Sequence, residues 1–409
     1  MTTIISDGLS DIFSEPLKYG GVKERIEVYQ MAENNTYTPA QIIRIRIPSC
    51  EIADMRNCVL EFNATCSQTG GVSIAFAQPI ACLFDRVRLL SNSLLIDDIL
   101  SYGRMYAAKL MSEDNTEWSS SLTITDGVGI YSARAANAAS TTIVYQVKLG
   151  YIMEVLDRCL PVGWMGNNQF TLELYCAGAL NVLENDGTGT NPTYVITNPQ
   201  LHYANINVTD EYKKMLNTKF AKDGISFSFR SFDNYISNLP ASSAGTVYTT
   251  LPFKKQKAIS ILGLATVTAN LTVPTALNKF ISFANYSYYG SSRLKINATY
   301  IPSDRVLNSY EQYLQVCDCF DLPYKNNSYI ANNWLSGNAF MLGQTIAPNP
   351  RNTSNDSIIQ GIDISQGNSN CISELTLSSA TASNESIYWF CEYFVVCHID
   401  SKGNVSIMD

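Results

Sequence analysis

The second half of the chain repeats the order of elements that the first half predicts. Residues 88–106 predict a strand, a short turn, a second strand and a helix, and residues 293–313 predict the same order 205 positions further on. A repeat of this length corresponds to a whole domain, because solenoid units are only about 20–50 residues long. The chain of 409 residues has room for two such domains.

Alternating apolar and polar residues predict antiparallel strands with one buried face. The clearest case is residues 43–47, where Ile alternates with Arg until Pro48. Residues 387–399 form a nearly continuous apolar run instead, which predicts a strand buried on both faces. Further strands with one apolar face are predicted around residues 58–62, 143–149, 170–174, 201–208 and 225–229.

Only short helices are expected between these strands. Apolar residues recur at helical spacing over residues 98–111. Thr209 predicts the N-cap of a helix over residues 209–216, which we expect to connect the two domains. In the second half, the helix that follows the repeated strands is expected to be capped near residues 303–304.

Many short strands, few helices and two matching halves predict an all-β protein. We expect two tandem eight-stranded jelly-roll β-sandwiches with a few short helices. The expected division is an N-terminal arm over residues 1–20, a first jelly roll with its connector helix over 21–218, and a second jelly roll over 219–409. The arm precedes the first predicted strand, and such termini become ordered mainly when a partner holds them.

The chain carries few charges. Charged residues make up 16%, whereas an average globular protein has about 25%. This composition is typical of surfaces covered by neighbouring molecules, or of a β protein with uncharged polar loops, and both interpretations stay open. The net charge is −8 and the largest basic cluster is residues 254–257. Because direct nucleic-acid binding calls for a basic face or arm, we expect none.

The sequence favours folding in a reducing compartment. It lacks a run of about 18 apolar residues, as a transmembrane helix requires, and its first residues lack the regions of a signal peptide. The 11 Cys residues are widely spread. Four of them lie in apolar runs and are predicted to be buried free thiols, namely Cys58, Cys82, Cys176 and Cys391.

No convergent set of catalytic or metal-binding residues is visible. The two His residues, His202 and His398, fall on separate predicted strands, and we expect packing roles for both. Cys317 and Cys319 have the wrong spacing for a zinc knuckle and no His partner nearby. We therefore expect them at a helix end, with one thiol buried.

Two acidic segments are also assigned structural roles. Asp97 and Asp98 would point to opposite faces of a strand, so we expect them to cap the helix that follows. The loop 184–191 has only Glu184 and Asp186 as carboxylates, too few for a calcium site. We expect no catalytic, cofactor-binding or metal-binding residues, no cofactor and no enzymatic activity.

Three stretches carry a resemblance to a known family. Residues 84–98 look like two strands before a short helix, residues 197–212 like a last strand with a connector helix, and residues 292–302 like the matching element of a second roll. Together they resemble the double jelly-roll major capsid proteins of polinton-like viruses, virophages and adintoviruses, a lineage that extends to the adenovirus hexon. The chain is short for this group, so long insertions between strands are not expected.

The resemblance implies a structural function in the virion. Three copies, each with two jelly rolls, would form a pseudo-hexagonal capsomer, and such capsomers would tile an icosahedral shell. The implied partners are other copies of this chain, penton proteins and minor capsid proteins. The inner surface would face other proteins or an internal membrane, and synthesis would take place in the host cytoplasm or nucleus.

Three other classes of protein fit parts of the sequence. A carbohydrate-binding or adhesin-type β-sandwich protein would explain the 24 Tyr residues, but it conflicts with the missing signal peptide and the duplicated helices. A cupin-type enzyme needs a cluster of His and carboxylate ligands, which two distant His residues do not supply. A single-roll capsid protein with a protruding domain would not show the repeat between the halves.

Overall fold

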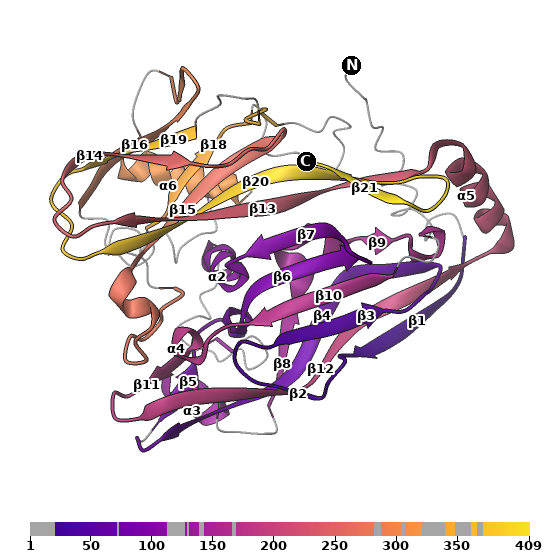
Figure 1. Cartoon of the computed structure of the whole chain (residues 1–409), viewed down its shortest axis with the longest axis horizontal. Coiled ribbons are helices and arrows are strands. Elements are labelled where there is room, and N and C mark those ends of the chain that lie inside the picture. Colours follow the sequence, from indigo (N-terminus) through magenta and orange to yellow (C-terminus); the bar gives the residue numbers. More distant parts are fainter. Residues whose placement is uncertain are drawn as a thin grey trace.

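The computed structural model describes residues 21–71, 73–112, 127–128, 131–138, 143–165, 169–281, 288–303, 307–320, 340–347, 361–365 and 371–409. These residues form two groups of antiparallel sheets, which lie before and after helix α5 (Asp210–Asp223) in the chain (Figure 1). The expected arm, residues 1–20, lies outside the described residues and stays a prediction.

The first group holds two sheets that pack face to face (Figure 1). One is formed by β1 (Val22–Met31), β12 (Thr190–Val208), β4 (Ile52–Thr69) and β8 (Val144–Lys148), in this order. The other is formed by β3 (Ile42–Ile47), β10 (Phe170–Cys176), β6 (Phe84–Ser91) and β7 (Leu94–Leu100), in this order. The short strands are β2 (Thr36–Tyr37), β5 (Ile74–Phe76), β9 (Cys159–Leu160) and β11 (Leu183–Asn185).

The second group is built in the same way. Its first sheet consists of β13 (Ile225–Leu239), β20 (Glu385–Ile399), β15 (Ala258–Val267) and β18 (Leu342–Thr345), in this order, and β21 (Val405–Met408) pairs with β20. Its second sheet consists of β14 (Gly245–Leu251), β19 (Cys371–Leu377), β16 (Tyr289–Ile296) and β17 (Thr299–Ile301), in this order.

The two groups follow one pairing rule. If the eight main strands of each group are numbered along the chain, the sheets read 1-8-3-6 and 2-7-4-5 in both groups. This wrapping of the ends of the chain around its middle is the jelly-roll arrangement. The predicted fold class, an all-β protein of two jelly rolls, is therefore confirmed. Below, the first roll comprises strands β1 to β12 and the second roll strands β13 to β21.

The strand patterns of the sequence correspond to buried and exposed faces. In β3, Ile43, Ile45 and Ile47 are fully buried, while the Arg residues between them point to the other face. Each such side chain contributes roughly 1.5–3 kcal/mol of hydrophobic stabilisation. The continuous apolar run lies in β20, which is paired with β13 and β15 on its two edges and is buried along most of its length.

The helices differ from their predicted bounds. Helix α2 (Tyr102–Ser112) begins later than expected, because Asp98 to Leu100 extend strand β7 through pairing with β6. Helix α5 begins after Thr209, whose side chain accepts a hydrogen bond from the N–H of Tyr212, but it continues to Asp223 rather than ending at residue 216. Among the described residues, the other α-helices are α3 (Tyr131–Ala138), α4 (Ala179–Val182) and α6 (Ser309–Cys319).

Helix α6 also begins later than the sequence suggested. Its N-cap is Asn308, whose side chain accepts from the N–H groups of Tyr310 and Glu311, and Glu311 bonds back to the N–H of Asn308. This reciprocal capping box satisfies backbone donors that would otherwise lack partners. The predicted cap near residues 303–304 is therefore wrong. Within the described residues, no helix has both the length and the apolar character needed to cross a membrane.

Candidate functional site

The two His residues lie in different rolls. His202 is on β12, where its ring meets that of Tyr29 edge-on at 4.4 Å, and its Nε2 atom lies 3.7 Å from Glu61 Oε1. His398 is on β20, and its Nδ1 atom lies 2.7 Å from the hydroxyl of Ser226. Because the two rings are on separate sheets with separate partners, they cannot share a catalytic or metal site.

The cysteines are free thiols with structural surroundings. Cys317 and Cys319 lie in the last turn of α6, with Cys317 buried and Cys319 half-buried. Burial raises the pKa of Cys58 and of Cys176 to about 12, so both thiols stay protonated and are poor nucleophiles. Across the part of the chain that the structure describes, no group of three or more His, Cys, Asp or Glu is placed to hold a metal ion.

The carboxylates of the loop 184–191 bind protein donors. The carboxylate of Glu184 is buried, and its Oε2 atom lies 3.0 Å from Nη2 of Arg134. Asp186 accepts hydrogen bonds from the hydroxyl of Thr188 at 2.7 Å and from the N–H of Ser73 at 3.2 Å. The two carboxylates thus face different partners and do not converge on a common point.

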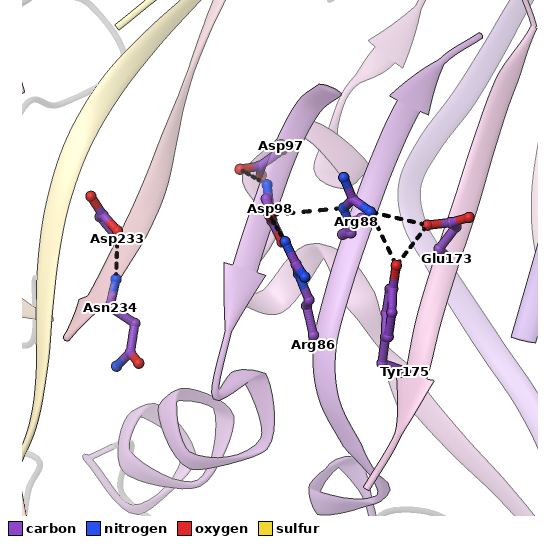
Figure 2. A network of polar contacts seen from close by, with 8 residues as sticks. All are labelled: Arg86, Arg88, Asp97, Asp98, Glu173, Tyr175, Asp233 and Asn234. Carbon is purple, nitrogen blue, oxygen red and sulfur yellow. Dashed lines mark hydrogen bonds and ion pairs between the residues drawn. The ribbon is translucent and has the colours of Figure 1, made fainter. Parts of the chain in front are cut away.

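Charged side chains cross the outer face of the sheet β3-β10-β6-β7 in a continuous row, which we call the outer charge row. Arg44 Nε lies 2.9 Å from Glu173 Oε1, and Glu173 Oε2 lies 3.4 Å from Arg88 Nη1. Arg88 also donates to the hydroxyl of Tyr175 at 3.0 Å, and its Nε lies 3.8 Å from Asp98 (Figure 2). These side chains are partly exposed, so the row stabilises the sheet only weakly.

The second roll has an equivalent ion pair at the same place in its sheet. Arg88 pairs with Glu173 between β6 and β10, and Arg293 pairs with Glu374 between β16 and β19. The Arg293–Glu374 distance is 2.9 Å, and the guanidinium of Arg293 also lies 3.8 Å from the ring centre of Tyr300. The repeat seen in the sequence therefore extends to individual side-chain contacts.

Other polar residues join the two rolls along a contact that we call the seam, where β7, α2 and neighbouring segments of the first roll meet the second roll. The hydroxyl of Ser231 on β13 donates to Asp97 Oδ1 on β7. The hydroxyl of Ser101 lies 3.4 Å from Asn234 Oδ1, also on β13. Figure 2 shows that Asp97 lies toward the strand that carries Asn234.

The seam overturns the capping role expected for Asp97 and Asp98. Both residues lie inside β7, and on opposite faces: Asp98 pairs with Arg86 in the outer charge row, while Asp97 is almost fully buried against the second roll. Burial raises the pKa of Asp97 to about 7, opposed by hydrogen bonds from Ser231 and from the N–H of Asp98. The alternation along a strand, not a helix terminus, fixes their directions.

A charged cluster extends the seam. Arg230 on β13 donates from its backbone N–H and its Nε to Glu154 Oε2 in the first roll, at 2.7 and 3.0 Å. Glu154 also pairs with Arg158, and Arg230 lies 3.3 Å from Glu392 on β20. The two Arg residues lower the pKa of Glu154 although its burial acts in the opposite direction. This carboxylate is therefore charged and shared between the rolls.

Arg104 of α2 inserts between two aromatic rings of the second roll. It is 8% exposed, and its guanidinium carbon lies 4.6 Å from the ring centre of Phe280 and 4.3 Å from that of Tyr388. A desolvated cation between ring faces is stabilised by the ring quadrupoles. The contact ties helix α2 to the turn that contains Phe280 and to strand β20, which carries Tyr388, although both come far later in the sequence.

The far end of the seam holds a buried ion pair. Arg134 of α3 lies 3.0 Å from Glu184, and both side chains are nearly inaccessible to water. From the second roll, Asn278 accepts from Arg134 at 3.2 Å, and the N–H of Lys279 donates to Glu184 at 3.2 Å. Burial lowers the pKa of Lys279 to about 8, and its ammonium donates to the carbonyl of Leu180 at 2.7 Å.

These contacts define what the seam does. A buried charge is costly unless it is paired, so the bonds from Arg230 to Glu154, from Lys279 to Glu184 and from Ser231 to Asp97 Oδ1 favour one relative position of the two rolls. The charged groups serve as partners of one another and present no open reactive constellation. The seam therefore orients the two rolls relative to each other.

Sequence reasoning missed most of the seam. Arg104, Arg134 and Arg230 stand among apolar or small residues that form helices and strands. An Arg side chain within such a segment indicates a polar contact, because an Arg on a buried face needs a partner. The partner itself could not be identified, because Asn278 and Glu392 lie more than a hundred residues away in the sequence.

Comparison with known proteins identifies the fold. No protein-family model and no curated protein matches the sequence. A protein of the PBCV-1 virus capsid matches with a TM-score of 0.57 at 12% identity, over 94% of this chain and 96% of that one. The Faustovirus major capsid protein matches with 0.54 at 11% identity, over 94% and 90%. The mavirus major capsid protein matches with 0.51 at 8% identity, over 93% and 90%. At these identities the likeness concerns the fold, and the chain has the double jelly-roll fold of these viral major capsid proteins.

Proposed function

We propose that this chain is a viral major capsid protein whose three copies form a pseudo-hexagonal capsomer. The observation that carries the proposal is the repeated pairing order of the strands, 1-8-3-6 and 2-7-4-5, in two rolls of one chain. Two rolls per chain give six similar units in a ring of three copies. Such a block has nearly equivalent sides, which is the property needed to tile an icosahedral face.

The seam supports this proposal. A tile must keep its two rolls in a fixed relative position, and this position is favoured by the bonds that Asn278 and Lys279 make to the buried Arg134–Glu184 pair and by the shared Glu154. The division into an arm over residues 1–20 and rolls over 21–218 and 219–409 belongs to the same proposal. Helix α5, which crosses residue 218, then acts as the connector between two units.

The remaining assignments follow from the capsid function. The partners are other copies of the chain, then neighbouring capsomers, penton proteins and minor capsid proteins, and the location is the virion. With a net charge of −8, the chain is suited to an inner surface that faces proteins or a membrane rather than the genome. Neither an enzymatic activity nor a cofactor is part of the proposal.

The carbohydrate-binding alternative gains no support from the exposed aromatic residues. Sugar stacking needs several rings on one platform. The most exposed Tyr residues among those described are Tyr29 on β1, Tyr248 on β14 and Tyr310 on α6, which belong to three different elements in both rolls. We therefore retain the capsid function alone.

The proposal is tested by mass and by shape. The purified chain of 45.2 kDa is expected to form a stable particle of three copies in a light-scattering or native mass measurement. Negative-stain images are expected to show a six-lobed outline. A monomer that persists at all micromolar concentrations would contradict the capsid function.

A further inference from the structure

The two rolls differ in how their corresponding helices are covered. Helix α2 follows the fifth main strand of the first roll, and nine of its 11 residues are buried. Helix α6 follows the fifth main strand of the second roll, yet Tyr310 is 66% exposed and Leu314 is 45% exposed. The difference arises because α2 lies beside the second roll within the seam (Figure 1).

The sheets that carry β13 and β1 differ in the same way. Strands β1 and β13 each begin directly after a Gly, and their first residues pair with the last residues of β12 and β20. These pairs are Val22 with Val208 and Ile225 with Ile399. Six positions before Val208 on β12 and before Ile399 on β20, the corresponding pairs are Tyr29 with His202 in the first roll and Ser231 with Tyr393 in the second; an irregularity between Val22 and Glu24 adds one residue to β1. Ser231 is buried under β7, whereas Tyr29 is 62% exposed.

The strand that covers Ser231 has its own equivalent in the second roll. In the repeated segment Arg88-Leu89 corresponds to Arg293-Leu294. Leu89 pairs with Asp97 on β7, and Leu294 pairs with Ile301 on β17. Ile301 is therefore the counterpart of Asp97. Within one chain Asp97 contacts Ser231. Among the described residues, the strands of the counterparts Ile301 and Tyr29 pair within their own rolls, β17 with β16 and β1 with β12.

We propose that β17 and α6 of one copy dock on the outer face of β1 and β12 of a second copy, as β7 and α2 dock on β13 and β20 within the chain. The occupant is a second copy, because the chain already shows how the equivalent surfaces fit. The inference rests on the proposed trimer and assigns its interface. Contact is head-to-tail, so each copy uses two different surfaces and the ring can close after three copies.

The chemistry of the two contacts differs in a way that fits their roles. The seam is polar where Asp97 meets Ser231. The corresponding position between copies would pair Ile301, which is partly buried against the core of its own chain, with Tyr29, next to exposed Met31 and with the exposed Tyr310 and Leu314 on the same side of the contact. Exposed apolar side chains of this kind drive association of folded subunits, because their burial removes them from water.

One experiment uses charge to disrupt the interface. Tyr29→Arg and Leu314→Arg each place a cation in the proposed contact, while both positions are exposed in the single chain, so folding should be unaffected. The matched control is Tyr248→Arg, since Tyr248 is 66% exposed on β14, at the opposite edge of its sheet from β17. We expect the dissociation constant of the trimer to rise at least tenfold in the first two variants. The control should remain a trimer, and its circular dichroism should be unchanged.

A second experiment tests the pairing itself. A Tyr29→Cys chain is mixed with an Ile301→Cys chain under mild oxidation, with the wild-type chain as the background for its own thiols. We expect cross-linked dimers from the mixture and from neither variant alone, and cross-linked trimers from the chain that carries both changes.

The outcomes separate the inference from the proposed function. If the wild-type chain is a trimer but Tyr29→Arg and Leu314→Arg remain trimers and no cross-link forms, the assigned interface is wrong and the capsid function stands. If either single Cys variant cross-links to itself, the contact is not head-to-tail and the assignment is also wrong. If the wild-type chain is a monomer throughout, the proposed function fails and the interface with it.

Discussion

Charged side chains lie in two settings in this molecule, in a buried ion pair at the seam and in partly exposed pairs on the outer sheet faces. Arg134 and Glu184 are 3% and 0% exposed, whereas Arg293 and Glu374, at a similar distance, are 25% and 11% exposed. The same pair of residue types therefore has two roles. Burial gives the seam pair a large effect when one partner is removed, while water screens the outer pair.

The physical reason is desolvation. A buried charge that loses its partner keeps the full cost of its removal from water, and the Coulomb interaction is strong in the interior. At the surface the solvent replaces a lost partner, so the loss is small. The comparison predicts a graded series of effects on stability, from the buried pair in the seam to the outer charge row.

The largest effect is expected for Arg134→Met. The change leaves Glu184 buried without its cation, although the N–H of Lys279 remains. We expect a loss of about 3–5 kcal/mol in the free energy of unfolding, measured by urea denaturation. The double variant with Glu184→Gln, which leaves neither charge alone, should recover a large part of this loss. An exposed ion pair contributes about 1 kcal/mol or less to the free energy of unfolding. A loss of only this size in Arg134→Met would therefore show that water reaches the pair.

A smaller effect is expected for Arg104→Met, which keeps the length and apolar volume of the side chain but removes its charge. Arg104 lies between the rings of Phe280 and Tyr388, which hold it across the seam. A desolvated cation–π contact is worth roughly 2 kcal/mol, so the free energy of unfolding should fall by about this amount. An unchanged denaturation midpoint would mean that packing alone holds α2 in place.

The next effect depends on pH and concerns Asp97. Its pKa is raised by burial to about 7 in the folded state, above the value of about 3.9 in an unfolded chain. Between these values the folded state binds a proton that the unfolded state lacks, so the stabilisation present at low pH is lost as the pH rises toward 7. Nearby Asp98 and Glu154 add to the shift.

The measurement compares the wild-type chain with Asp97→Asn, which stays neutral and can keep the bond to Ser231. Between the unfolded and the folded pKa of Asp97, the free energy of unfolding of the wild type should fall by about 1.4 kcal/mol per pH unit relative to this variant. Above about pH 7 the difference should stop growing. Denaturation curves at several pH values give the difference. Parallel pH profiles would show that Asp97 stays ionised in the fold.

The sequence allowed the fold to be predicted from local patterns. The alternation in β3 and the apolar run in β20 depend only on neighbouring residues, and both gave correct strands. The repeat around Arg88 and Arg293 then gave two rolls. The starts of α2 and α6 were wrong because a strand pairing with β6 outcompetes the helical spacing at Asp98, and because Asn308 offers a better cap than residues 303–304.

The seam could not be predicted in this way. Its contacts join Arg104 to Phe280 and Tyr388, and Arg230 to Glu154, from one roll to the other. Local propensity carries no information on such pairs, since the relative position of two sandwiches depends on all contacts at once. Asp97 shows the limit most clearly: its direction followed from strand alternation, but its partner Ser231 is known only from the fold.

The smallest effect is expected in the outer charge row of the first roll and in the equivalent ion pair of the second roll, which serve as controls for each other. Arg293 pairs with Glu374 at 2.9 Å and lies over the ring of Tyr300, and Arg88 holds the equivalent place beside Glu173. Solvent reaches both arginines, so Arg293→Met and Arg88→Met should each cost about 1 kcal/mol or less in the free energy of unfolding. Added salt should shrink these losses further, because it screens exposed pairs but leaves Arg134 with Glu184 nearly unaffected. If Arg88→Met alone proved as costly as Arg134→Met, the first roll's row would have to be covered in the native particle, and the measured cost should then fall when the chain is studied as a monomer.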